Sequence, residues 1–355
     1  MAVTPGFWSG RRVLVTGHTG FKGAWLSLWL AAMGAEVTGL SDGVPTEPSL
    51  FELARLEEDV RTVRADVRDA DAVRRALAEA RPEVVLHLAA QPLVRRSFAE
   101  PRETFEVNVM GTVNVLDAVR LVPGVRAVVN VTSDKCYENR EWDWAYREDE
   151  PMGGHDPYSS SKGASELVTS AYRRSFFSEA DGPRLASARA GNVIGGGDWG
   201  VDRLVPDVMR AALAGAAVDI RNAGATRPWQ HVLNPLSGYL ALAERLGADP
   251  AAAAAWNFGP AESDARPVGW VVDRLDALWP GGLRWERDDR EHPHEARYLK
   301  VDSSRARAHL GWAPRWPLER TLESIVEWYV ALQAGEDMRT VSLAQLDAFQ
   351  AEIAS

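Results

Sequence analysis

Two patterns of apolar residues alternate along the first half of the chain. A short apolar run with β-branched residues stands at 11–17 (RRVLVTG), and similar runs recur at 35–41, 83–90 and 126–133. Between them, apolar residues recur every three or four positions, as from Phe21 to Met33 and in DADAVRRALAEA at 69–80. The first pattern predicts buried strands and the second predicts helices. This alternation favours a Rossmann-type α/β fold, a doubly wound parallel sheet that binds its ligand at the carboxyl ends of the strands.

The pattern changes after about residue 190. Glycines cluster in GNVIGGGDWG at 191–200, and the periodic segments become shorter. PLSGYLALAERL at 235–246 is expected to be a helix that returns to pack on the first sheet, with later helices at 302–312 and 318–332. We therefore expect an NAD-binding Rossmann domain over 1–190 plus about 231–250. A smaller mixed α/β lobe over about 191–230 and 251–355 would bind the substrate.

Composition narrows the class of protein. The chain has 355 residues and a formal net charge of −10, which argues against nucleic acid as a partner. No stretch has the roughly 20 apolar residues of a membrane span, and the N-terminus lacks an apolar core of signal-peptide length. Cys136 is the only cysteine, so an internal disulfide is excluded and a reducing cytoplasm is expected.

A glycine-rich turn follows the first expected strand. VTGHTGFKG places Gly17, Gly20 and Gly23 between that strand and the first helix. Glycines at such a turn let backbone N–H groups approach a pyrophosphate and let the helix pack closely on the strand. Alone the pattern also suits a purely structural turn, but its position between a strand and an amphipathic helix predicts a dinucleotide site.

Further cofactor contacts are expected at the other strand ends. Asp42 follows the second strand, where a carboxylate accepts hydrogen bonds from a ribose 2′-OH and favours NAD over NADP, although an exposed loop aspartate is the alternative. Asp66 and Val67 end a short third strand and are placed near the adenine. The cofactor residues we expect are Gly17, Thr19, Gly20, Phe21, Lys22, Asp42, Asp66, Val67, Leu88, Ala89, Ala90, Tyr158 and Lys162.

YSSSK at 158–162 places Tyr158 and Lys162 on one face of a helix introduced by Pro157. A free tyrosine, with a pKa of about 10, is a poor base at neutral pH. An adjacent ammonium, together with the positive nicotinamide ring, favours its phenolate. The same spacing occurs by chance on helices. Here, however, a strand ending at Ser133 and a glycine turn precede it, which predicts a catalytic pair.

Together these features resemble the extended short-chain dehydrogenase/reductase family over nearly the whole chain. Within that family, GHTGFKGAWL, PTEPSLFELARL, SDKCYEN, GGHDPYSSSKGASE and RPWQHVLNPLSGYL resemble nucleotide-sugar 4,6-dehydratases. The resemblance implies NAD as cofactor and CDP-glucose as substrate, which would lose water between C5 and C6. Tyr158 would take the proton of the sugar 4-hydroxyl and Ser133 would hold that oxygen.

The resemblance also implies roles for the two residues after Ser133. Elimination needs an acid at the C6 hydroxyl and a base at C5, and we expect Asp134 to be the acid and Lys135 the base. A lysine base must be neutral, which burial beside a positive charge favours and a salt bridge to Asp134 opposes. A charged Lys135 that only stabilises the enolate remains the alternative.

The substrate diphosphate suits arginine, whose planar fork binds phosphate oxygens in pairs. Placement by resemblance selects Arg203, Arg227 and Arg297, with Asn192 as a further donor and with Gln91 and Asn108 lining the sugar pocket. Each arginine could instead be a surface residue. His292 and His294 lack a third ligand at a suitable spacing, so no metal is expected.

Two rival functions and an oligomeric state complete the expectations. An epimerase acting on another nucleotide sugar would use the same tyrosine and lysine without losing water. A non-catalytic cofactor sensor is disfavoured by the presence of Ser133, Tyr158 and Lys162. The helices at 108–118 and 158–177 carry apolar residues on more than one face, and in relatives such helices pair across a two-fold axis, so we expect at least a homodimer.

Overall fold

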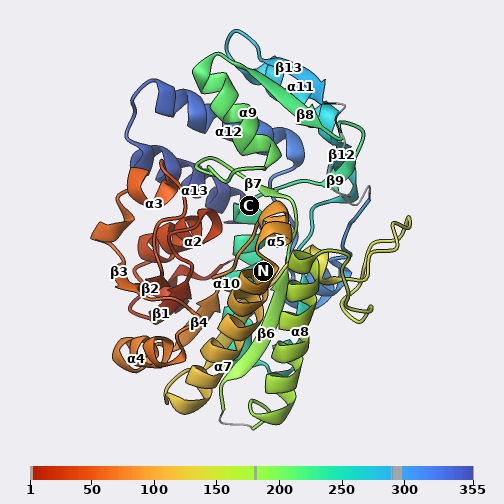
Figure 1. The fold of residues 1–355 in the computed structure, drawn as a ribbon. Coiled ribbons are helices and arrows are strands. Elements are labelled where there is room, and N and C mark those ends of the chain that lie inside the picture. The colour runs from red at the N-terminus through yellow and green to blue at the C-terminus, as the bar shows by residue number, and fades with distance from the viewer. Residues whose placement is uncertain (1–2, 180–181, 289, 291–297, 355) are drawn as a thin grey trace.

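The computed structural model describes residues 3–179, 182–288, 290 and 298–354. At its centre lies a seven-stranded sheet in the order β11-β6-β5-β4-β1-β2-β3, and all its pairings are parallel (Figure 1). Its strands are β1 (Arg12–Thr16), β2 (Glu36–Ser41), β3 (Arg61–Arg64), β4 (Val84–His87), β5 (Ala127–Val131), β6 (Arg184–Arg189) and β11 (Ala255–Asn257). The strand order reverses at β1, which pairs with both β2 and β4, and such a switch point is where Rossmann folds bind their ligands.

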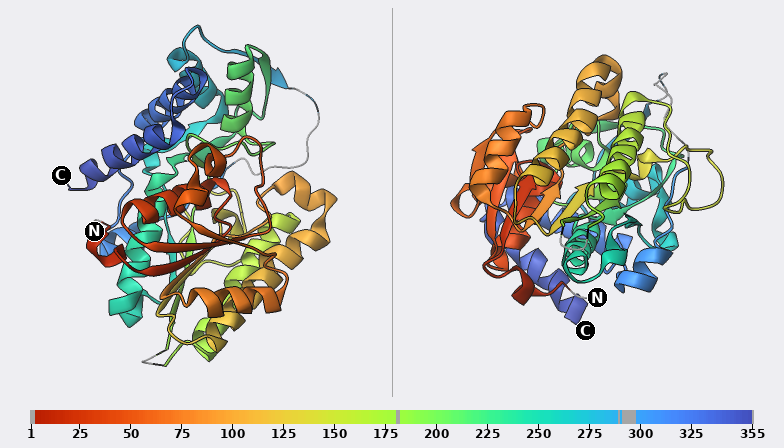
Figure 2. Two further views of the ribbon diagram at one scale, coloured as in Figure 1. Left: turned by 90° about the vertical axis from the view of Figure 1, so that its left-hand side faces the viewer. Right: turned by 90° about the horizontal axis from the view of Figure 1, so that it is seen from below.

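Helices cover both faces of this sheet (Figure 2). Along β1, Val13 and Val15 belong to one apolar core together with Trp25 of α2, whereas Leu14 belongs to a second core together with Leu116 of α7. Successive side chains of a strand point to opposite faces, so a continuous apolar strand is buried on both. The helices on this sheet include α2 (Phe21–Ala32), α4 (Ala70–Ala80), α7 (Gly111–Leu121), α8 (Pro157–Ser175) and α10 (Leu233–Ala248). The predicted α/β fold is confirmed.

The smaller lobe lies over the carboxyl ends of the strands (Figure 1). Its strands pair as β8 (Ala217–Arg221) with β13 (Arg284–Asp288), β9 (Thr226–Pro228) with β12 (Ala265–Pro267), and β7 (Val193–Ile194) with β10 (Gln230–His231). Its helices are α9 (Leu204–Ala214), α11 (Val268–Leu278) and α12 (Leu318–Gln333). The shorter elements and the last helix are α1 (Pro5–Trp8), α3 (Leu50–Leu53), η1 (Leu56–Glu58), α5 (Val94–Ala99), α6 (Pro101–Phe105), η2 (Glu106–Met110), η3 (Asp134–Cys136), η4 (Pro250–Ala252), η5 (Glu262–Asp264), η6 (Ala306–Leu310) and α13 (Met338–Ala354).

The C-terminal third differs from the sequence prediction. β11 extends the main sheet by pairing with β6, so the expected boundary at residue 251 falls just before a strand of the Rossmann sheet. α13 also returns to the first domain, where Trp29 of α2 donates a hydrogen bond to Gln350 over 3.3 Å. The segment 302–312 forms only the short helix η6. In the described part of the chain, no helix has the length and apolar character that crossing a membrane requires.

Candidate active site

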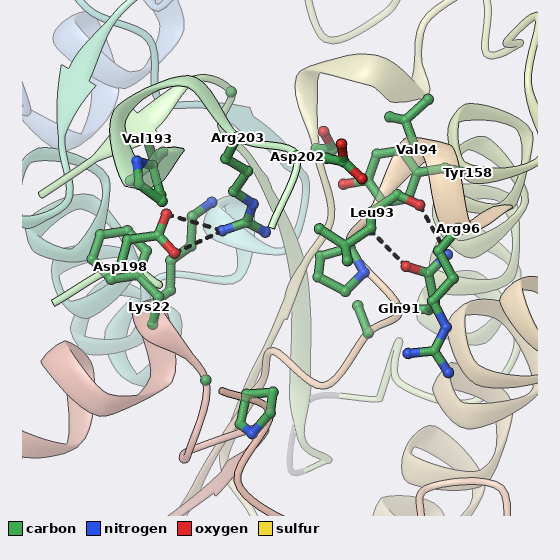
Figure 3. Close-up of a pocket in the computed structure, with 18 of the residues that line it drawn as sticks. Lys22, Gln91, Leu93, Val94, Arg96, Tyr158, Val193, Asp198, Asp202 and Arg203 are labelled. Atoms are coloured by element: carbon green, nitrogen blue, oxygen red, sulfur yellow. Dashed lines mark hydrogen bonds and ion pairs between the residues drawn. The ribbon is translucent and has the colours of Figure 1, made fainter. Parts of the chain in front are cut away.

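A cavity of about 580 Å³ lies between the carboxyl ends of the main sheet and the smaller lobe. Its walls come from the β1–α2 turn, the ends of β4 and β5, the start of α8 and the segment from Ala190 to Asp207. Figure 3 shows Lys22, Asp198 and Arg203 on one side of this cavity and Tyr158 and Gln91 on the other. The sequence-predicted cofactor and catalytic residues all line this one cavity.

The β1–α2 turn requires two of its glycines. Gly17 has a φ of +71°, and a Cβ there would lie 2.8 Å from the backbone of Ala89. A Cβ at Gly23 would lie 2.1 Å from the carbonyl oxygen of Gly17, so only glycine lets α2 pack this closely on the turn. Gly20 precedes the first turn of α2 and offers no side-chain cap, which leaves the N–H groups of that turn available to an anion.

Two side chains of this turn are oriented by their neighbours. The Thr19 hydroxyl donates to the carbonyl of Gly43 over 2.6 Å and thereby ties the turn to the end of β2. Lys22 lines the cavity, where burial and the nearby charge of Arg203 lower its pKa to about 8. A cation and free N–H groups therefore face the same part of the cavity.

The remaining cofactor candidates lie at strand ends, as predicted. Asp42 is exposed at the cavity edge, and Asp66 accepts three hydrogen bonds from Arg68 that lower its pKa. After β4, the Leu88 and Ala89 N–H groups both donate to the hydroxyl of Thr16 over 3.1 Å. That contact holds the segment after β4 against the end of β1.

Ser133, Asp134 and Lys135 follow β5 after one intervening residue, Thr132. The Ser133 hydroxyl accepts from the Lys135 N–H over 3.2 Å and donates to Asp134 Oδ1 over 3.0 Å. Asp134 is 2 % exposed, and its Oδ2 has no hydrogen-bond partner within the described chain. Lys135 is half-buried at the cavity wall and forms no ion pair with any residue that the structure describes. The salt bridge to Asp134 that would oppose a neutral Lys135 is thus not formed.

Tyr158 and Lys162 lie on the first turns of α8, which Asp156 caps by accepting from the Ser159 N–H over 2.9 Å. Both side chains are buried and line the cavity. Burial raises the pKa of Tyr158 to about 12, although a hydrogen bond with Ser133 and the charge of Arg203 act in the opposite direction. Burial also lowers the pKa of Lys162 to about 8. The lowered tyrosine pKa that the sequence predicted is therefore not a property of this protein alone.

The substrate candidates divide into three groups. Gln91, Asn192, Arg203 and Arg227 line the cavity, and Arg203 pairs with Asp198 over 3.1 Å. Arg297 lies outside the described residues, as do His292 and His294.

Asn108 forms the third group. It was predicted to line the sugar pocket, but it is not among the residues that line the cavity. Its amide hydrogen-bonds to the N–H and C=O of Gln91 and to the Ser161 hydroxyl. All its polar atoms are used in holding Gln91 against α8, so we correct its expected role from substrate contact to positioning.

Sequence reasoning missed several charged residues of the cavity. Asp198, Asp202, Arg95 and Arg221 line it, and Asp202 lies 3.7 Å from Arg95 and 3.4 Å from Arg221. Asp198 stands in the GGGDW stretch that had already been singled out for its glycines. The other three lie in loops or near the end of a helix or strand, where no hydrophobic periodicity indicates which way a side chain points.

Comparisons with known proteins agree with this geometry. The model of the NAD dependent epimerase/dehydratase family matches residues 13–258. The chain is 54% identical to the CDP-glucose 4,6-dehydratase of Salmonella typhimurium over 96% of each chain. It is also 31% identical to the UDP-glucose 4-epimerase of Mycolicibacterium smegmatis, over 90% of this chain and 98% of that protein.

A solved structure has the same fold. The UDP-glucose 4-epimerase of Stenotrophomonas maltophila, with bound NAD and formylated UDP-arabinopyranose, superposes with a TM-score of 0.79 at 21% identity. The superposition covers 92% of this chain and 99% of that one. With its glycine turn, its tyrosine–lysine pair and its match to the family model, the chain belongs to the NAD dependent epimerase/dehydratase family.

Proposed function

We propose that this protein removes water from CDP-D-glucose to give CDP-4-dehydro-6-deoxy-D-glucose. One observation carries the proposal: Ser133, Asp134 and Lys135 line the same cavity as Tyr158 and Lys162, in a chain 54% identical throughout to a CDP-glucose 4,6-dehydratase. In this reaction C4 is oxidised, water leaves across C5 and C6, and C6 is reduced. The nucleotide sugar is the only substrate consumed.

The site fits NAD. The first turn of α2 has no side-chain cap, and the glycines before it let a pyrophosphate approach, with Lys22 as the neighbouring cation. Asp42 would hold the adenosine ribose, Asp66 and Val67 would contact the adenine, and the segment Leu88–Ala90 would lie along the cofactor. Bound there, NAD would supply the acceptor for the hydride that leaves C4 of the sugar and the donor of the hydride that C6 receives.

The first proton transfer belongs to Tyr158. Its phenolate oxygen accepts the proton of the sugar 4-hydroxyl, and Ser133 hydrogen-bonds the same sugar oxygen to hold it in place. Because burial raises the pKa of Tyr158 to about 12, the site has to stabilise the phenolate before it can act. The Ser133 hydrogen bond and the charge of Arg203 support that form. The ammonium of Lys162, one helical turn along α8, would add to this stabilisation.

The elimination belongs to Asp134 and Lys135. A ketone at C4 acidifies the C5 hydrogen, which Lys135 removes, while Asp134 donates a proton to the departing C6 hydroxyl so that water leaves. Lys135 lines the cavity and forms no ion pair with Asp134 in the described chain, which leaves its amine free to face the sugar. A charged Lys135 that stabilises the enolate without taking the proton is the competing assignment.

The two lobes divide the binding of the two nucleotides. The Rossmann sheet would hold the dinucleotide, and Arg203, Arg227 and Asn192, which line the cavity from the smaller lobe and its connection, would bind the substrate diphosphate. Gln91 and Arg297 remain proposed contacts, Gln91 at the sugar and Arg297 at the diphosphate. We keep the proposed assignment of about 191–230 and 251–355 to the substrate-binding lobe, except that β11 belongs to the main sheet.

The protein is proposed to act as a homodimer in the cytoplasm. Large apolar side chains remain exposed on adjacent helices between α5 and α8: Phe98, Phe105, Met110, Leu121, Leu167 and Phe176. A second copy related by a two-fold axis would bury this face. The single, buried Cys136 supports a reducing compartment.

Epimerisation is the second candidate, favoured by the 31% identity to a UDP-glucose 4-epimerase. The two reactions are distinguished by incubating the purified protein with CDP-, UDP-, dTDP- and GDP-glucose without added NADH. The proposal expects a 4-keto product lighter by one water, formed fastest from the cytidine substrate. An isomer of unchanged mass would establish the epimerase, and equal rates with all four nucleotides would contradict the cytidine assignment.

A further inference from the structure

A buried ion pair lies behind the catalytic residues. Glu166 of α8 and Arg189 of β6 meet at 2.7 Å, and each side chain is 4 % exposed. Neither residue lines the cavity, so neither touches the substrate. Glu166 stands one helical turn after Lys162 and two turns after Tyr158, and both of those residues face the cavity.

Each member of the pair is bonded to the chain on one side of Ser133–Lys135. Glu166 accepts a hydrogen bond from the Thr132 hydroxyl over 2.5 Å, immediately before the catalytic stretch. Arg189 donates to the Tyr137 hydroxyl over 2.7 Å, two residues after the stretch, and its guanidinium lies 5.0 Å from the Tyr137 ring centre. The three catalytic residues are therefore flanked by two ties to the same ion pair.

Two further hydrogen bonds hold the pair, and a third holds Tyr137. The Ser187 hydroxyl of β6 donates to Glu166 over 2.7 Å, and Arg189 donates to the carbonyl of Glu148 over 3.0 Å. Tyr137 donates to Asn257 of β11 over 2.7 Å. These buried hydrogen bonds fix both ends of the segment relative to α8 and β6.

We infer that Glu166 and Arg189 are positioning residues that hold Ser133, Asp134 and Lys135 in register with Tyr158 and Lys162. This inference rests on the proposed function. The proton of the 4-hydroxyl, the C5 hydrogen and the C6 hydroxyl belong to one sugar, so the two groups of side chains must keep a fixed spacing to act on it in turn. Small displacements of a catalytic group are costly, and losing 1 Å of alignment can reduce a rate by about 100-fold.

The test removes single hydroxyls and leaves the buried charges paired, because an unpaired buried charge strongly destabilises a fold. Thr132→Val removes the tie before the catalytic stretch and Tyr137→Phe removes the tie after it. Thr169→Val is the matched control: its hydroxyl accepts from Asn130 over 2.7 Å, so it joins the same strand β5 to the same helix α8, but away from the cavity.

Two measurements are made on each variant. Hydrogen–deuterium exchange reports the order of segment 133–137 without any turnover, and steady-state kinetics with the nucleotide sugar reports kcat and KM. We expect faster exchange in this segment and a kcat reduced roughly tenfold in T132V and Y137F, with a KM changed far less. T169V keeps both values close to those of the wild type.

The outcomes separate this inference from the proposed function. If the wild type does not dehydrate any nucleotide sugar, the proposed function fails and the exchange measurement alone decides the inference. Exchange of 133–137 in T132V and Y137F that equals exchange in T169V overturns it. So does a wild-type kcat in both variants when the wild type is active.

Discussion

The Oδ2 oxygen of Asp134 lies against the α-carbon of Gly191. A Cβ built at Gly191 would lie 1.7 Å from that oxygen, and the oxygen is buried without a hydrogen-bond partner in the described chain. The backbone after β6 thus leaves room for the carboxyl group that we assign as the acid. The proposed acid can occupy this position only because residue 191 is a glycine.

Gly191→Ala is therefore expected to displace Asp134. The new methyl group would overlap the carboxylate, so kcat should fall by roughly 100-fold, the usual contribution of a general acid. Gly247→Ala is the control, because a Cβ at Gly247 meets nothing within 4 Å. Steady-state kinetics on both variants checks this, and a G191A enzyme with the wild-type kcat would show that Asp134 does not act from its observed position.

Asp134→Asn is expected to separate oxidation from elimination. The amide keeps the size of the side chain but donates no acidic proton, so water loss should slow by about 10²- to 10⁴-fold while Tyr158 and Ser133 still act at C4. Stopped-flow absorbance should then show reduced nicotinamide accumulating after the substrate is added. No accumulation together with a normal rate of water loss would assign the acid to another group.

Lys135 variants distinguish its two assigned roles. A base must accept the C5 proton, so Lys135→Arg, which stays charged, should be as inactive as Lys135→Met. If the ammonium only stabilises the enolate, K135R keeps much of the activity that K135M loses. Incorporation of solvent deuterium at C5, followed by mass spectrometry, checks proton removal directly, and retained incorporation in K135R would favour the charged role.

Three buried histidines make stability depend on pH. Burial lowers the pKa of His87 and of His231 to about 3, and that of His18 to about 4, from an ordinary value of 6.5. Between these values the unfolded chain binds protons that the folded protein does not, so stability is present at pH 7 and is lost as pH falls below 6.5. Each histidine should cost about 2 kcal/mol of unfolding free energy between pH 7 and pH 5.

Urea unfolding at several pH values measures this dependence. His87→Gln and His231→Gln should each flatten the acid side of the profile, whereas His309→Gln, at an exposed position, should leave its slope unchanged. A slope that stays at the wild-type value in both buried variants would show that these histidines do not titrate on unfolding as expected.

The sequence predicted the central strands of the sheet, and the ligand site at their carboxyl ends, better than it predicted the second lobe. The apolar runs at 11–17 and 126–133 became β1 and β5, since a strand buried on both faces leaves a clear pattern. β11 was missed because its three residues follow an alanine run and carry no alternation. The helix expected at 302–312 is likewise only the short η6 in the structure.

The candidate site was predictable where a residue's position follows from a strand end or a helix turn. Ser133, Tyr158 and Lys162 are such residues, and all three line the cavity. The pairing of Arg203 with Asp198 and the role of Asn108 depend on contacts between distant segments, which one sequence does not display. The direction of the Tyr158 pKa depends on burial, which also requires the folded structure.

The fate of the C4 hydrogen tests the central claim most directly. The purified protein is given CDP-glucose carrying deuterium at C4, and the product is analysed by mass spectrometry and NMR. The account predicts a product that has lost one water and carries the deuterium at C6, because the hydrogen removed in the first step is the one returned in the last. Deuterium retained at C4, or an isomer formed without loss of water, would contradict it.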